Sequence, residues 1–180
     1  MFEHETSNLK IKNKLHPELW AYDLNPDKWE KKYIHYQTRV RDWDSIVDEL
    51  GPELYSWPIF TEEFCRHIME EADYQDIWTV DRHYHYPTTD FVLTEIGLDD
   101  IYMKMLRKYA FPVARHVWGL TGEMWDEKMS AENFLAKYSP DAQGHLDSHI
   151  DSSQYSITLA LNNDFVKGGT FYHRQKTLVK

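Results

Sequence analysis

The chain has 180 residues, 42% hydrophobic and 28% charged, which is enough for the core of one domain and excludes long disorder. Its formal charge of −10 argues against a general binder of nucleic acids or anionic membranes and favours a cationic partner. The single cysteine excludes an internal disulfide, and no apolar run reaches the roughly 20 residues of a membrane-spanning helix.

The first 50 residues predict an arm of short helices packed against the main body. Between residues 15 and 47, aromatic side chains alternate with charged ones and are interrupted by Pro17 and Pro26. Such a segment holds too little apolar surface for a core of its own. We therefore assign 1–50 to an N-terminal arm and 51–180 to the main domain.

Two helices are predicted in the middle of the chain. Thr61 is the expected N-cap of the first, because two glutamates follow in the first turn and an apolar stripe continues at helical spacing. The second begins near Asp99, and Pro112 is expected to kink or divide it. Cys65 lies in the first stripe, which favours a small buried hydrophobe over a nucleophile.

Beyond residue 129 the hydrophobic period changes to two, which predicts strands. Residues 133–138 and 155–161 alternate between apolar and small or polar side chains, and Gly168-Gly169 precedes a third strand at 170–174. Helices followed by strands indicate an α+β domain with helices packed on one face of an antiparallel sheet.

The chemistry is concentrated in residues 144–153, where the pattern His-x-Asp occurs twice, as His145/Asp147 and His149/Asp151. On an extended chain, residues i and i+2 point to the same side, so an imidazole and a carboxylate can reach one metal ion. Such a pair is two-thirds of the two-histidine, one-carboxylate site of non-haem Fe(II) enzymes. Composition alone yields such pairs by chance, so a solvated polar loop is the alternative.

Several motifs, in order, resemble the catalytic domain of the procollagen lysyl hydroxylases. The motifs are Trp57-Pro-Ile-Phe-Thr-Glu-Glu-Phe-Cys, Pro87-Thr-Thr-Asp, Asn133-Phe-Leu-Ala-Lys-Tyr-Ser-Pro-Asp-Ala-Gln, His149-x-Asp, Tyr155-Ser-Ile-Thr-Leu-Ala-Leu-Asn and Gly168-Gly-Thr-Phe. The resemblance implies a double-stranded β-helix, or jelly roll, with helices packed on one sheet. It implies that His149 and Asp151 bind iron, whereas His145 and Asp147 fall at positions that carry no ligand.

The resemblance also implies the activity. The family hydroxylates lysine in X-Lys-Gly sequences of collagen-like chains with Fe(II), O2 and 2-oxoglutarate, giving succinate and CO2, and ascorbate restores Fe(II). Tyr138 and Thr158 are expected to contact 2-oxoglutarate, and Asp90 to position the substrate. Family members often form homodimers and work in the lumen of the endoplasmic reticulum, although this chain shows no signal segment; no nucleic acid and no membrane insertion are expected.

The sequence also departs from the family pattern. The family's third iron ligand, a histidine, and its 2-oxoglutarate-binding arginine fall beyond Lys180, and His173 follows the glycine pair too closely to replace that histidine. The last strands of the jelly roll are therefore expected to be missing. Three alternatives stay open: a prolyl or other 2-oxoglutarate hydroxylase, a catalytically inactive fragment or binding module, and a structural subunit that dimerises through the tryptophan-rich arm.

Overall fold

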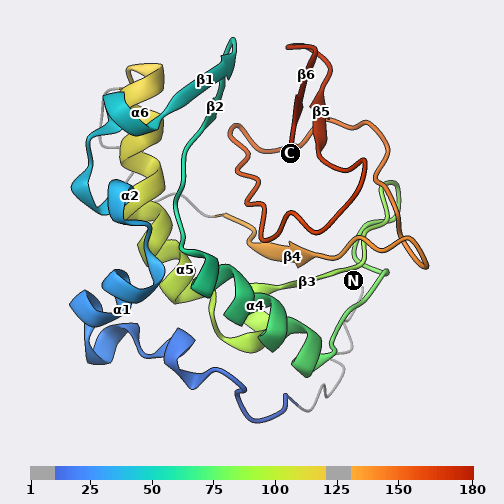
Figure 1. The fold of residues 1–180 in the computed structure, drawn as a ribbon. Coiled ribbons are helices and arrows are strands. Elements are labelled where there is room, and N and C mark those ends of the chain that lie inside the picture. Colours follow the sequence, from blue (N-terminus) through green and yellow to red (C-terminus); the bar gives the residue numbers. More distant parts are fainter. Residues whose placement is uncertain (1–10, 121–130) are drawn as a thin grey trace, which may run out of the picture.

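The computed structural model describes residues 11–120 and 131–180 (Figure 1). The elements are η1 (Pro17–Trp20), η2 (Tyr22–Leu24), α1 (Pro26–Tyr33), α2 (Tyr36–Val40), α3 (Trp43–Ile46), β1 (Asp48–Gly51), β2 (Leu54–Ser56), α4 (Glu62–Gln75), β3 (Asp90–Val92), η3 (Leu93–Ile96), α5 (Asp99–Met105), the π-helical turn η4 (Leu106–Ala110), α6 (Phe111–Trp118), β4 (Phe134–Ala136), β5 (Thr170–Tyr172) and β6 (Thr177–Val179). None of the helices in these two ranges is long and apolar enough to cross a membrane.

The described part of the arm, from residue 11, consists of short helices that enter the main core. Asn25 caps α1 by accepting a hydrogen bond from the backbone N–H of Lys28 at 3.0 Å. Trp29 and Tyr33 of α1 are buried, and the Trp29 indole N–H donates to the carbonyl of Leu19 at 3.0 Å. The arm therefore contributes core residues.

A buried carboxylate fastens the start of the arm to α4. Glu71 is fully buried and accepts hydrogen bonds from the backbone N–H groups of Leu15 and His16, both at 2.8 Å. The side-chain amide of Gln75, one turn further along α4, donates to the same carboxylate at 2.7 Å. Because three donors satisfy this buried charge, it holds two segments that are distant in the sequence together.

The two predicted helices are confirmed. The Thr61 hydroxyl accepts from the backbone N–H of Phe64 at 3.3 Å and caps α4, whose predicted stripe faces the core. The second helix begins at Asp99 and passes through η4 into α6, where Pro112 lies in the first turn. A π-helical turn just before a proline accommodates the missing N–H without ending the helix. Gly119, at a φ of +59°, ends α6.

The core lies among the helices and β3, while the later strands lie outside it. Every buried hydrophobic residue in the described part of the chain precedes residue 114. The whole of 131–180 is described, and it contains only half-buried and exposed residues. Figure 1 shows this segment as long connections and short strands on the side of the molecule away from α1 and α2.

The predicted α+β class is confirmed: the described residues form a mixed α+β fold with three two-stranded antiparallel sheets, β1–β2, β3–β4 and β5–β6. The predicted jelly roll is not seen in these residues and stays a prediction. Residues 155–161 keep only part of the predicted alternation: Leu159 and Leu161 pack against the core, whereas Ile157 on the same predicted face is 49% exposed. A strand is stabilised by hydrogen bonds to a neighbouring strand, and this segment pairs with no strand in the described residues.

Candidate metal-binding site

His149 and Asp151 lie on an irregular extended segment, and their side chains converge. The Nε2 atom of His149 is 3.1 Å from Oδ1 of Asp151. Metal–ligand bonds of about 2.1 Å that meet at a right angle put their donor atoms about 3.0 Å apart. This spacing therefore fits two neighbouring ligand positions on one ion.

The hydrogen bonds around the pair orient both groups. The Nδ1 atom of His149 lies 2.9 Å from the backbone carbonyl of Asp147, which has no proton, so Nδ1–H is the donor. In the neutral ring, Nε2 then carries a lone pair facing the carboxylate of Asp151. The other oxygen of Asp151 accepts from the hydroxyl of Ser156. In that tautomer a cation between the two groups would bind both the ring nitrogen and the carboxylate oxygen.

The other His-x-Asp pair is more loosely arranged. Nε2 of His145 is 3.6 Å from Oδ1 of Asp147, and both side chains are 83% exposed, against 31% for His149. The His149 ring instead rests near the ring of Tyr86, with 5.1 Å between centroids. Of the two pairs, only His149 and Asp151 combine close donors with partial shelter, the arrangement that metal sites need.

A pocket of about 310 Å³ is lined in part by Tyr86, whose ring contacts that of His149. It is lined by two segments, 85–87 and 142–147, so it reaches Asp147 but not His149 or Asp151 themselves. Gln143 holds these segments together: its amide nitrogen donates to the carbonyl of Pro87 at 2.7 Å and its amide oxygen accepts from the backbone N–H of Thr89. A small polar ligand next to the pair would occupy this space.

The three other predicted site residues lie in different surroundings. Tyr138 is half-exposed, and burial together with the charge of Asp90 raises the pKa of its hydroxyl. Asp90 itself is fully buried and is bonded to Arg82 at 2.6 Å and to the hydroxyl of Thr88. Thr158 is exposed on the alternating segment. Asp90 pairs with Ala136 of β4, two residues before Tyr138, and the roles of all three residues stay predictions.

Sequence reasoning assigned no role to several residues that shape this region. Arg82 neutralises Asp90, Tyr86 contacts the ring of His149, and Gln143 ties the turn after β4 to the segment before β3. The signal for Gln143 was present, since it ends the motif that starts at Asn133. No spacing rule connects Arg82 or Tyr86 with the later histidine.

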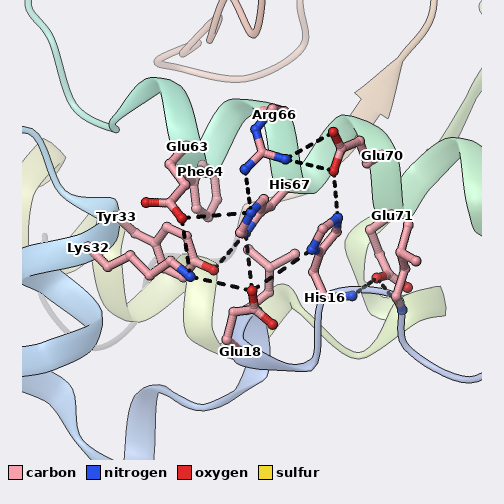
Figure 2. Close-up of polar contacts among 12 residues, drawn as sticks. His16, Glu18, Lys32, Tyr33, Glu63, Phe64, Arg66, His67, Glu70 and Glu71 are labelled. Atoms are coloured by element: carbon pink, nitrogen blue, oxygen red, sulfur yellow. Dashed lines mark hydrogen bonds and ion pairs between the residues drawn. The ribbon is translucent and has the colours of Figure 1, made fainter.

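A second polar cluster joins the arm to α4 (Figure 2). Donor atoms of His16, Glu18 and His67 all lie within 4.8 Å of one another, close enough to hold one metal ion. The His16 Nε2–H donates to Glu70 at 2.7 Å, and His67 Nδ1 is 2.9 Å from the hydroxyl of Tyr33. It is the one group of three such ligands found in the described ranges.

The two rings of this cluster are stacked, with centroids 4.0 Å apart and planes 8° from parallel. Each imidazole lone pair lies in the plane of its ring, so an ion placed correctly for His16 would lie outside the plane of His67. Arg66 also donates to Nε2 of His67 at 2.8 Å. Burial, then the nearby His16 and Arg66, lowers the pKa of His67. In this arrangement the cluster serves as a polar clamp between the arm and α4.

A comparison with protein-family models identifies the class of domain to which the chain belongs. Residues 12–123 match the family model described as the OGFOD2-like domain, and the chain belongs to this family of 2-oxoglutarate dioxygenase domains. The matched residues hold the arm and the helical core, and they end before His149.

Within that class, the chain is homologous to procollagen lysyl hydroxylase domains. It is 31% identical over 173 residues to the rat multifunctional procollagen lysine hydroxylase and glycosyltransferase LH3, covering 89% of this chain and 23% of the relative. It is 30% identical over 172 residues to mouse procollagen-lysine,2-oxoglutarate 5-dioxygenase 2, again covering 89% of this chain and 23% of the relative. It is also 30% identical over 192 residues to the procollagen lysyl hydroxylase and glycosyltransferase of Acanthamoeba polyphaga mimivirus, covering 96% of this chain and 21% of the relative. The chain thus spans about a quarter of the length of the curated relatives it matches.

Proposed function

We propose that this chain takes part in the hydroxylation of peptidyl-lysine in collagen-like X-Lys-Gly sequences, with Fe(II), O2, 2-oxoglutarate and ascorbate. Its relatives are named as hydroxylases of procollagen lysine, which supports the substrate, and the −10 charge suits a lysine-bearing peptide. A hydroxylase of proline or of another substrate in the same class is the second candidate, because the His-x-Asp pair does not select the substrate.

In this proposal, His149 supplies an imidazole nitrogen and Asp151 a carboxylate oxygen to the iron. The observation that carries it is the distance of 3.1 Å between Nε2 of His149 and Oδ1 of Asp151, while Nδ1–H of His149 donates to the carbonyl of Asp147. The bound iron would supply the oxidation, as in the family. The chain's own residues hold the donors in place, and Tyr138 offers a hydroxyl for the carboxylate of 2-oxoglutarate.

The first test measures metal binding by the full chain. Co(II), a spectroscopic substitute for Fe(II), is titrated into the wild type, His149→Ala, Asp151→Ala and the matched control His145→Ala. We expect each of the first two variants to lower the affinity about tenfold or more, since each loses one ligand, and the control to behave as the wild type. Equal affinity in all four proteins would contradict the proposed ligands, and equal, negligible affinity would favour a binding module.

The second test measures succinate formed from 2-oxoglutarate with Fe(II) and ascorbate. A collagen-like peptide containing lysine is compared with one in which every lysine is replaced by proline. We expect succinate only with the lysine peptide. Turnover only with the proline peptide would keep the oxygenase but refute the substrate, and turnover with neither peptide by a metal-binding chain would favour the inactive module.

A further inference from the structure

A cationic hollow lies on the arm, away from the His149 region. It has a volume of about 500 Å³ and is bordered by Lys31 of α1, Arg39 and Arg41 at the end of α2, and Lys108 of η4. These four cations converge in a chain whose net charge is −10, so the local charge is opposite to that of the molecule. Such a reversal focuses an attractive field for anions.

The two acidic residues of the hollow do not cancel these charges. Glu30 accepts from Lys108 at 2.5 Å and from the hydroxyls of Tyr109 and Tyr22 at 2.6 and 2.9 Å. Burial alone would raise the pKa of Glu30, but these bonds lower it, so the carboxylate stays charged and is fully used by its partners. Asp27 is exposed at the border of the hollow.

Lys31, Arg39 and Arg41 have no such partner. No carboxylate in ranges 11–120 and 131–180 lies within ion-pair distance of any of the three. Arg39 uses its Nε–H on the carbonyl of Ile34 at 3.3 Å, which leaves its terminal nitrogens available. Two guanidinium groups and one ammonium group thus face the hollow with unused donors.

The backbone of Arg41 is unusual for a charged residue. It ends α2 at a φ of +63°, a left-handed conformation that glycine adopts without strain and that most other residues avoid. Its guanidinium lies over the ring of Tyr109, 5.6 Å from the centroid. The backbone at this position would suit glycine best, yet the position carries arginine, the side chain with the most hydrogen-bond donors.

We propose that this hollow binds the phosphate group of a small phosphorylated ligand. Paired guanidinium groups recognise phosphate through fork-shaped, charge-assisted hydrogen bonds, which the compact charge of lysine cannot form. A volume of about 500 Å³ accommodates a ligand larger than a single phosphate. The site is independent of the proposed hydroxylase function, because it shares no residue with it.

The test titrates pyrophosphate and orthophosphate into the full chain at constant ionic strength, by calorimetry and phosphorus NMR. We expect tighter binding of pyrophosphate, and a loss of about tenfold or more in Arg39→Gln and in Arg41→Gly, since each removes charge-assisted bonds. Arg41→Gly should also keep the melting temperature at or above that of the wild type, because it relieves the backbone. Loss of binding in a fully folded variant separates recognition from stability.

Two control variants make the outcome decisive. Arg107→Gln removes the same charge next to Lys108 but outside the lining of the hollow, and it should leave binding within about twofold of the wild type. His149→Ala should bind pyrophosphate as the wild type does. An equal loss in Arg107→Gln would show a net-charge effect only, and no wild-type binding at millimolar pyrophosphate would also overturn the proposal.

Discussion

His67 shows how one side chain makes the arm sensitive to pH. It is 4% exposed and lies between the stacked ring of His16 and the guanidinium of Arg66. Burial and these neighbours lower its pKa, while Glu18 acts in the opposite direction. Because the unfolded chain then binds a proton more readily than the folded one, stability is complete above the ordinary value of 6.5 and is lost as the pH falls through it.

We therefore expect the melting temperature to fall as the pH is lowered from about 7.5 to about 5.5. The fall should be smaller in His67→Gln, because glutamine keeps hydrogen-bonding atoms but does not titrate. Thermal unfolding of both proteins across this range measures the difference. Identical slopes for the two would refute the assignment.

The proposed phosphate site and the proposed iron ligands differ in how far the sequence could reveal them. The prediction of His149 and Asp151 as ligands rests on their two-residue spacing and on the motifs that surround it. The cationic hollow joins side chains of α1, α2 and η4, and no local pattern links Lys31 with Lys108. Arg41 carries no sequence signal for its positive φ, since the usual marker of that conformation is glycine.

At the scale of elements, α4 was predictable because its signals are local. The cap at Thr61, the acidic first turn and the apolar stripe all act within the helix. The strands were predictable only as alternation, because sheet pairing depends on partners far along the chain. The α+β class is confirmed, whereas the jelly roll is not seen in the described residues and stays a prediction. The alternation of apolar and polar side chains alone could not predict that the strands pair into three separate two-stranded sheets.

Thr61 connects the helix with the arm, and this gives a prediction for α4. Its hydroxyl donates to the carbonyl of Lys32 at 2.9 Å while accepting from Phe64. Thr61→Ala should cost about 1–2 kcal/mol of unfolding free energy, measured in urea, and Thr61→Ser should cost much less because it keeps the hydroxyl. An equal loss of unfolding free energy in both variants would show that the methyl group of Thr61, and not its hydroxyl, stabilises the helix.

At the scale of the whole molecule, Glu71 decides whether the arm stays attached. Removing its carboxylate leaves the backbone N–H groups of Leu15 and His16 without their acceptor. Glu71→Ala should cost about 2–3 kcal/mol and speed trypsin cleavage at Lys12 and Lys14, as followed by mass spectrometry.

Glu70→Ala is the matched control, because it removes a carboxylate from the same helix that is 42% exposed. It should change cleavage of the arm far less than Glu71→Ala does, since exposed ion pairs add little stability. Faster cleavage in Glu70→Ala than in Glu71→Ala would mean that the polar clamp around His16 and His67, and not the buried carboxylate of Glu71, fastens the arm.

The way the arm is fastened has a consequence for the nascent chain. Its partners come much later in the sequence: the Trp20 indole bonds the carbonyl of Ile96, and Lys104 bonds Asp23. At about 5–20 residues per second, a ribosome needs roughly 4–16 s to make the intervening segment. The aromatic residues of the arm thus leave the ribosome before these partners exist, and during this delay they are natural targets for chaperones.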